Sequence, residues 1–117
     1  MLNKKFLKYI NKFLNRKDIL ELDDIEYLAD KIYKPISLTI HECDKILLKL
    51  YDILNAAFVS NRIEYDNAVM VICGLIAVQH IIETSPICNN YLVLKYDHCQ
   101  SLYSSIKDTL VIKWEGL

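Results

Sequence analysis

The chain has 117 residues, of which 53% are hydrophobic and 25% are charged, and its formal net charge at pH 7 is −1. This length and composition predict one globular domain, residues 1–117, with enough apolar side chains for its own core. The near-neutral charge argues against binding of nucleic acid through a large positive charge. With only two glycines and two prolines, the chain lacks the regular turns of an all-β protein, so we predict an all-α fold.

The N-terminal residues do not have the pattern of a secretion signal, because Tyr9-Ile10-Asn11-Lys12 interrupts any continuous apolar segment there. We therefore expect a cytoplasmic protein whose cysteines are reduced, and buried, because cysteine is among the most frequently buried residue types. The four cysteines are Cys43, Cys73, Cys88 and Cys99.

The first two predicted helices carry opposite charge. The first, Leu2–Leu14, has apolar residues at three- and four-residue spacing on one face and lysines on the other. Six basic residues lie in segment 4–17, and six acidic residues follow in segment 18–30. The start of the chain is therefore strongly polarised, with one basic and one acidic surface.

The second helix is predicted to begin near Asp23. Asp23 and Glu26 have the spacing of a capping box. Leu22 and Tyr27, on either side of it, have the spacing of a hydrophobic staple. The helix ends at Lys34, because the residue that precedes a proline is disfavoured in helical geometry.

The third and fourth helices are predicted to form the centre of the protein. Thr39 and Glu42 form another capping box, and the helix that they start ends at a turn in residues 60–62. The fourth helix covers about residues 64–83. Its segment 68–82 is apolar on nearly every face, which is typical of a helix surrounded by the rest of a protein. That segment is shorter than the ~18–20 apolar residues of a membrane span.

The C-terminal region permits two interpretations. Residues 91–96 favour either a helix or a strand, and the β-favouring residues 110–114 would pair with such a strand as a hairpin. We favour the helix, with Asp97 as a cap for the last part. The predicted architecture is a single-domain bundle of five or six helices around the central apolar helix, with a short β-hairpin near the C-terminus as the alternative.

No residue pattern indicates an enzyme, a cofactor or a metal site. His41 and His98 each lie near a cysteine, but structural zinc sites usually show paired ligands a few residues apart. Cys73 lies in the most apolar segment, which disfavours the thiolate that a nucleophile needs. The two glycines, Gly74 and Gly116, cannot form a phosphate-binding loop. We expect no catalytic residues, no metal ligands and no cofactor.

Binding to another protein is the function class that remains, and the acidic second helix is the predicted binding surface. Acidic side chains there would steer a basic partner, and tyrosine is enriched in protein interfaces. The predicted contact residues are Asp23, Asp24, Glu26, Tyr27 and Asp30. The lysines of the first helix are the alternative surface, unless Lys5, Lys8 and Lys12 simply face the acidic helix.

The leading hypothesis is an immunity or antitoxin-like protein that binds and neutralises a cognate toxin, in particular a basic nuclease. In its small size, its helical character and its Ile-, Lys-, Asn- and Tyr-rich composition, the chain resembles bacterial immunity proteins. That resemblance implies a partner protein that is covered by the acidic and tyrosine-bearing surface.

The alternative hypothesis is a viral host-interaction protein. Amphipathic helices around one apolar central helix look like the Bcl-2-like helical bundle, which implies binding of an amphipathic helix in a groove. The Asn-Trp-Gly-Arg signature of the cellular members is absent, and the only tryptophan is Trp114. A third hypothesis is binding of a membrane surface or of nucleic acid through the basic first helix.

Overall fold

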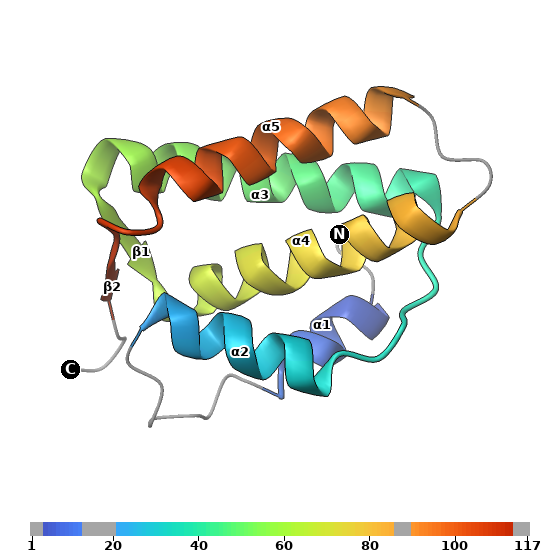
Figure 1. Ribbon diagram of the computed structural model, residues 1–117, viewed down its shortest axis with the longest axis horizontal. Coiled ribbons are helices and arrows are strands. Elements are labelled where there is room, and N and C mark those ends of the chain that lie inside the picture. The colour runs from blue at the N-terminus through green and yellow to red at the C-terminus, as the bar shows by residue number, and fades with distance from the viewer. Residues whose placement is uncertain (1–3, 13–20, 86–89, 114–117) are drawn as a thin grey trace.

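The computed structural model describes residues 4–12, 21–85 and 90–113, and these form a helical bundle. Figure 1 shows five helices and two short strands in this part of the chain. They are α1 (Lys4–Ile10), α2 (Leu22–Ile32), α3 (Ile40–Ser60), β1 (Arg62–Glu64), α4 (Tyr65–Thr84), α5 (Asn90–Ile106) and β2 (Val111–Lys113). The predicted all-α fold is confirmed. The ends of the predicted first helix, Leu2 and Leu14, lie outside the described residues.

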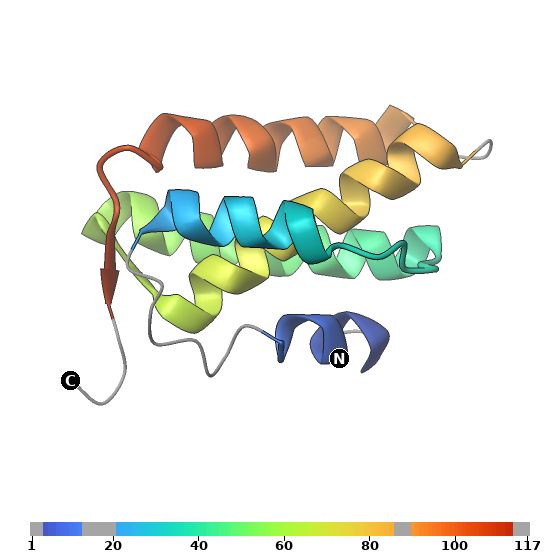
Figure 2. The same ribbon diagram turned by 60° about the horizontal axis from the view of Figure 1, so that its bottom comes forward.

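Helix α4 is the centre of the bundle, as predicted. It packs against each of the four other helices, which surround it in both views of the ribbon (Figures 1 and 2). Ten of its residues are buried. At 20 residues, α4 is long and apolar enough to cross a membrane by length and composition alone. The predicted argument from the length of segment 68–82 does not extend to the whole helix, and 50% of the most apolar 18-residue window of α4 is buried within the bundle.

Helices α3 and α5 run in the same direction along one side of α4. Lys95 donates a hydrogen bond of 2.6 Å to Asp44 near the start of both helices. One turn further along, the thiol of Cys99 lies 3.6 Å from the carbonyl oxygen of Leu47. The opposite side is covered by α1 and α2, where the buried phenol of Tyr9 donates to the carbonyl oxygen of Ala29 at 3.2 Å.

The predicted start of the third helix is confirmed. Thr39 Oγ1 accepts a hydrogen bond of 3.1 Å from the N–H of Glu42, and Glu42 Oε1 accepts one of 3.0 Å from the N–H of Thr39. The predicted turn after Ser60 is confirmed as well. Asn61 adopts the left-handed conformation (φ 58°) that stops the helix, and asparagine is one of the few residues that tolerate it.

The predicted start of the second helix is displaced by two residues. Helix α2 has Glu21 as its N-cap, and the carboxylate that closes the capping box belongs to Asp24, which accepts from the N–H of Glu21 at 3.2 Å. Leu22 is therefore already helical and buried, while Tyr27 is 61% exposed. Side chains five residues apart on a helix lie on different faces, so the predicted staple does not form.

The predicted hairpin is not observed in the described residues. Residues 91–96 belong to α5, where Leu92 is buried. Strand β2 pairs instead with β1, in parallel, with Ile63 opposite Ile112. Because the chain leaves both α3 and α5 at the same end of the bundle (Figure 1), the partner of β2 is the strand already present there. Trp114 lies outside the described residues.

Candidate protein-binding groove

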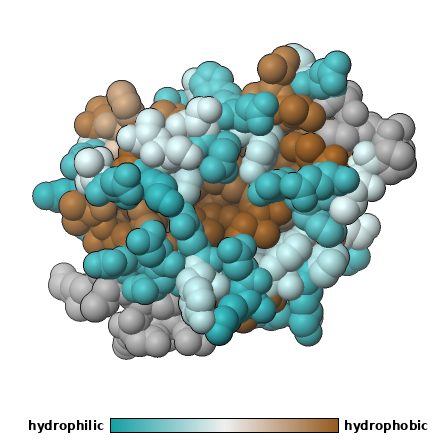
Figure 3. Space-filling model, in the orientation of Figure 1, coloured by the Kyte–Doolittle hydropathy of each residue, from teal (hydrophilic) through white to brown (hydrophobic). Residues whose placement is uncertain are grey.

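A groove with an apolar floor lies over α4, between α2 and α5. Its volume is about 240 Å³. In Figure 3, an apolar region is visible at the centre of this face between hydrophilic residues, where Figure 1 places α4. The floor consists of Ile72, Leu75 and Ile76 of α4, and Ile76 is the most accessible of the three. The polar walls are Glu26 and Asp30 of α2, Gln79 of α4, and Gln100 and Tyr103 of α5.

A hydrogen-bonded cluster joins the two walls of the groove. The hydroxyl of Tyr103 donates to Glu26 Oε1 at 2.5 Å, and Lys107 Nζ lies 3.2 Å from the same oxygen. Burial raises the pKa of the Tyr103 phenol, and the hydrogen bond to the Glu26 carboxylate raises it further. The phenol therefore remains a neutral donor, and Glu26 serves as a link between α2 and α5.

The five predicted contact residues divide between internal and external roles. Asp24 caps α2, and Glu26 bridges to α5, so these two carboxylates stabilise the fold itself. Asp23 and Asp30 are exposed, and their side chains form no hydrogen bond or ion pair within the described part of the chain. Tyr27 is exposed too, with the ammonium of Lys31 4.6 Å from its ring centroid.

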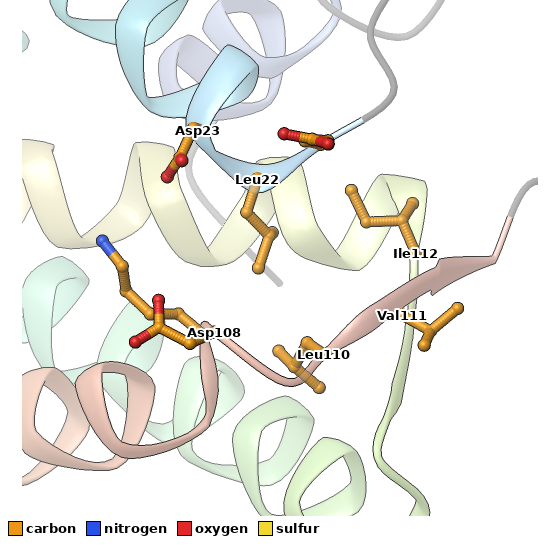
Figure 4. Close-up of a pocket in the computed structure, with 8 residues that line it drawn as sticks. Leu22, Asp23, Asp108, Leu110, Val111 and Ile112 are labelled. Atoms are coloured by element: carbon orange, nitrogen blue, oxygen red, sulfur yellow. The ribbon is translucent and has the colours of Figure 1, made fainter.

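A second hollow lies nearer the strands. It has a volume of about 420 Å³ and lies between the start of α2 and the chain that leaves α5. Figure 4 shows Leu22 of α2 pointing toward the segment that carries Leu110, with Asp23 and Asp108 on the polar side. Because Asp23 lines this hollow while Glu26 and Asp30 line the groove, α2 presents one acidic edge along both.

Three of the cysteines are buried, and His80 packs against an aromatic ring. Cys43, Cys73 and Cys99 are buried and form no disulfide with one another. Burial raises the pKa of Cys73 to about 12 and that of Cys99 to about 11, which keeps both thiols protonated and unreactive at neutral pH. The ring of His80 lies edge-on to Tyr33, with centroids 5.6 Å apart. Among the described residues, no group of three or more potential ligands is arranged to hold a metal ion.

Most of the groove was not predicted from the sequence. None of the predicted contact residues is Ile76, Gln79, Gln100 or Tyr103, although Ile76 and Gln79 follow each other at helical spacing on α4. Gln100 and Tyr103 do the same on α5, and Lys107 follows in the turn after that helix. Such spacing marks one face of a helix, but it does not say which other helix that face meets. Comparison of the chain with known protein families, curated proteins and solved structures gives no significant match.

Proposed function

We propose that this chain is a non-catalytic binding protein that holds an amphipathic helix of a partner protein in the groove between α2 and α5. One observation carries the proposal: a strip of α4 that includes Ile76 is left between two polar walls. A partner helix would place its apolar residues on this strip and its polar face toward solvent. This is the mode of binding that the Bcl-2-like hypothesis implies.

The small volume of the groove favours binding of side chains from a partner protein over binding of a small-molecule ligand. Its volume of about 240 Å³ lies below the range of roughly 300–1,000 Å³ that is typical of ligand pockets. A few apolar side chains from successive turns of a helix fit a shallow site of this kind. The remaining contact area would come from the rims, which α2 and α5 supply along their length.

The charge of the polar walls indicates which kind of partner helix would fit the groove. Glu26 is already paired with Lys107, but Asp30 is exposed and lacks any such pairing in the described residues. A basic residue on the flank of the partner helix would meet Asp30 there. The expected partner is thus an amphipathic helix with apolar residues on one face and a lysine or arginine beside them.

The proposal is tested with helical peptides selected for binding to the purified protein. We expect Ile76→Ala to weaken binding of the selected peptides about tenfold or more, as for an interface anchor. Asp30→Lys, at an exposed position, should weaken binding of peptides with a basic flank and leave the helical content unchanged. Asp52→Lys is the matched control, because Asp52 is an exposed aspartate on α3, away from the groove. Equal affinity of all variants for the selected peptides would exclude this groove as the binding site.

An immunity or antitoxin-like function is the second candidate, and the exposure of Tyr27 favours it. Tyr27 is 61% exposed on α2, between Asp23 and Asp30 in the sequence, and it does not line the groove. A folded basic toxin, such as a nuclease, would contact these three side chains from outside the groove. Tyr27→Ala and Asp23→Lys should then abolish binding while Ile76→Ala does not. Binding of a helix in the groove predicts the opposite, namely that Ile76→Ala weakens binding more than Tyr27→Ala or Asp23→Lys does.

A further inference from the structure

A basic hollow lies on the side of the bundle formed by α1. Lys5, Lys8 and Lys12 line it from one side, and Lys34 lines it from the segment that follows α2. In Figure 1, this segment leaves the end of α2 beside α1. The other lining residues are Tyr9, Pro35, Ile36 and Ser37, and the volume is about 390 Å³.

Lys8 and Lys12 do not neutralise the acidic edge of α2. Lys8 and Lys12 form no ion pair with any described residue, and no carboxylate is among the described residues that line the hollow. Lysines three and four residues apart repel one another along a helix, which disfavours the helix itself. The chain has 14 basic residues in all, and four of them lie around this one hollow. The composition of the chain alone does not explain why they gather there.

We infer that this hollow, which we call the lysine hollow, binds a ligand with several phosphate groups. Lysine ammonium groups bind phosphate as point charges, and four of them from two segments surround a space large enough for a compact polyphosphorylated group. The apolar contacts of Tyr9, Pro35 and Ile36 border the same space and would support the carbon skeleton of such a ligand. The source is either a soluble polyphosphate or the headgroup of a polyphosphorylated lipid.

The shape and chemistry of the hollow disfavour a nucleic-acid strand. Arginine, whose guanidinium group recognises a base by forming two hydrogen bonds with it, is not among the described lining residues. A strand also requires a groove that follows its backbone over several nucleotides, with aromatic platforms for the bases. The lysine hollow is a compact site with a single lining aromatic residue, Tyr9, among those described.

The test uses the full chain with tripolyphosphate as the soluble probe. Lys8→Glu combined with Lys34→Glu removes one lysine from each side of the hollow. Lys45→Glu combined with Lys49→Glu is the matched control, because both residues are exposed on α3 and the change in net charge is the same. We expect the first pair to weaken tripolyphosphate binding about tenfold or more, and the control pair to leave it within about twofold.

Vesicles distinguish the two sources of phosphate. Binding to phosphatidylcholine vesicles that contain a phosphatidylinositol bisphosphate, more tightly than to phosphatidylserine vesicles, would identify a lipid headgroup. Binding of tripolyphosphate with no gain on the vesicles would identify a soluble ligand. Equal losses for the two variant pairs would mean that only net charge matters, and would overturn the inference. Failure of both probes to bind, or tighter binding of single-stranded RNA than of either, would overturn it as well.

Discussion

The hydroxyl of Tyr103 in α5 donates a 2.5 Å hydrogen bond to the carboxylate of Glu26 in α2, across 77 positions of sequence. Tyr103 is only 5% exposed, whereas the Glu26 side chain remains 32% exposed. The bond therefore joins a buried donor to a carboxylate at the edge of the groove. Since the two residues stand on opposite walls, this hydrogen bond joins α2 to α5 directly.

Removal of the Glu26 carboxylate is expected to destabilise the protein. Glu26→Ala should lower the free energy of unfolding by about 1–2 kcal/mol, because the buried phenol of Tyr103 loses its acceptor. In a double-mutant cycle with Tyr103→Phe, the two losses of stability should not add. Chemical denaturation of the wild type, the two single variants and the double variant should give a coupling energy of about 1 kcal/mol. Asp44→Ala is the control. Asp44 pairs with Lys95 at similar exposure but leaves no buried donor, so its loss should cost less than about 1 kcal/mol.

The fold was predictable where the signal is local. The apolar faces of α4, the capping box at Thr39 and the turn at Asn61 each depend on residues within a few positions of one another, and each was correctly placed. The strand pairing was not predictable in this way. Ile63 and Ile112 are opposite one another because α3 and α5 end at the same end of the bundle. That arrangement follows from packing, not from the sequence around either strand.

The groove was predictable only in part for the same reason. The acidic residues of α2 were identified from their charge, but charge does not reveal that Asp24 caps its own helix or that Glu26 meets Tyr103. Whether a carboxylate is available to a partner depends on what lies opposite it in space. The sequence therefore identifies α2 as an acidic helix, but it does not show that Asp24 and Glu26 are already engaged within the fold.

The corrected position of the capping box has a measurable consequence. Asp24→Ala should lower the free energy of unfolding by about 0.5–1 kcal/mol, because the N–H of Glu21 loses its acceptor. Asp23→Ala should change it by less than about 0.5 kcal/mol, as for an exposed residue without a partner. Both acids lie in the first turn of α2 and interact with the helix dipole alike, so the difference reports the contacts that Asp24 makes and Asp23 does not. Equal losses would contradict Asp24 as the cap.

At Gly74, α4 packs directly against α3. A Cβ atom added there would lie 2.8 Å from Leu50 Cδ1 and 3.2 Å from Ile46 Cγ2, and both neighbours are fully buried. Alanine favours a helix over glycine by about 1 kcal/mol, but overpacking of a core costs typically about 1–3 kcal/mol. Gly74→Ala should therefore lower the melting temperature slightly, and Gly74→Val should lower it much further. A higher melting temperature for Gly74→Ala would show that α3 moves away at no cost.

The buried thiols predict a loss of stability at alkaline pH. Burial raises the pKa of Cys73 from its ordinary 9.0 to about 12, while a hydrogen bond with Tyr9 acts weakly in the other direction. Between these values the folded protein keeps a proton that the unfolded chain has released. The stabilising contribution is thus complete below pH 9 and is lost as the pH rises toward 12. Unfolding by urea at a series of pH values should show the free energy of unfolding falling above pH 9.0.

Two measurements separate this effect of Cys73 from general alkaline unfolding. In Cys73→Ala the free energy of unfolding should fall less steeply above neutral pH, although it starts lower because of the cavity. The remaining slope comes from groups such as Cys99 and Tyr103, whose pKa values burial also raises. In the wild type at neutral pH, iodoacetamide should not label Cys43, Cys73 or Cys99 until urea is added, as peptide mass spectrometry would report. Labelling of Cys73 in the folded protein would contradict its burial in α4 and the pH dependence derived from it.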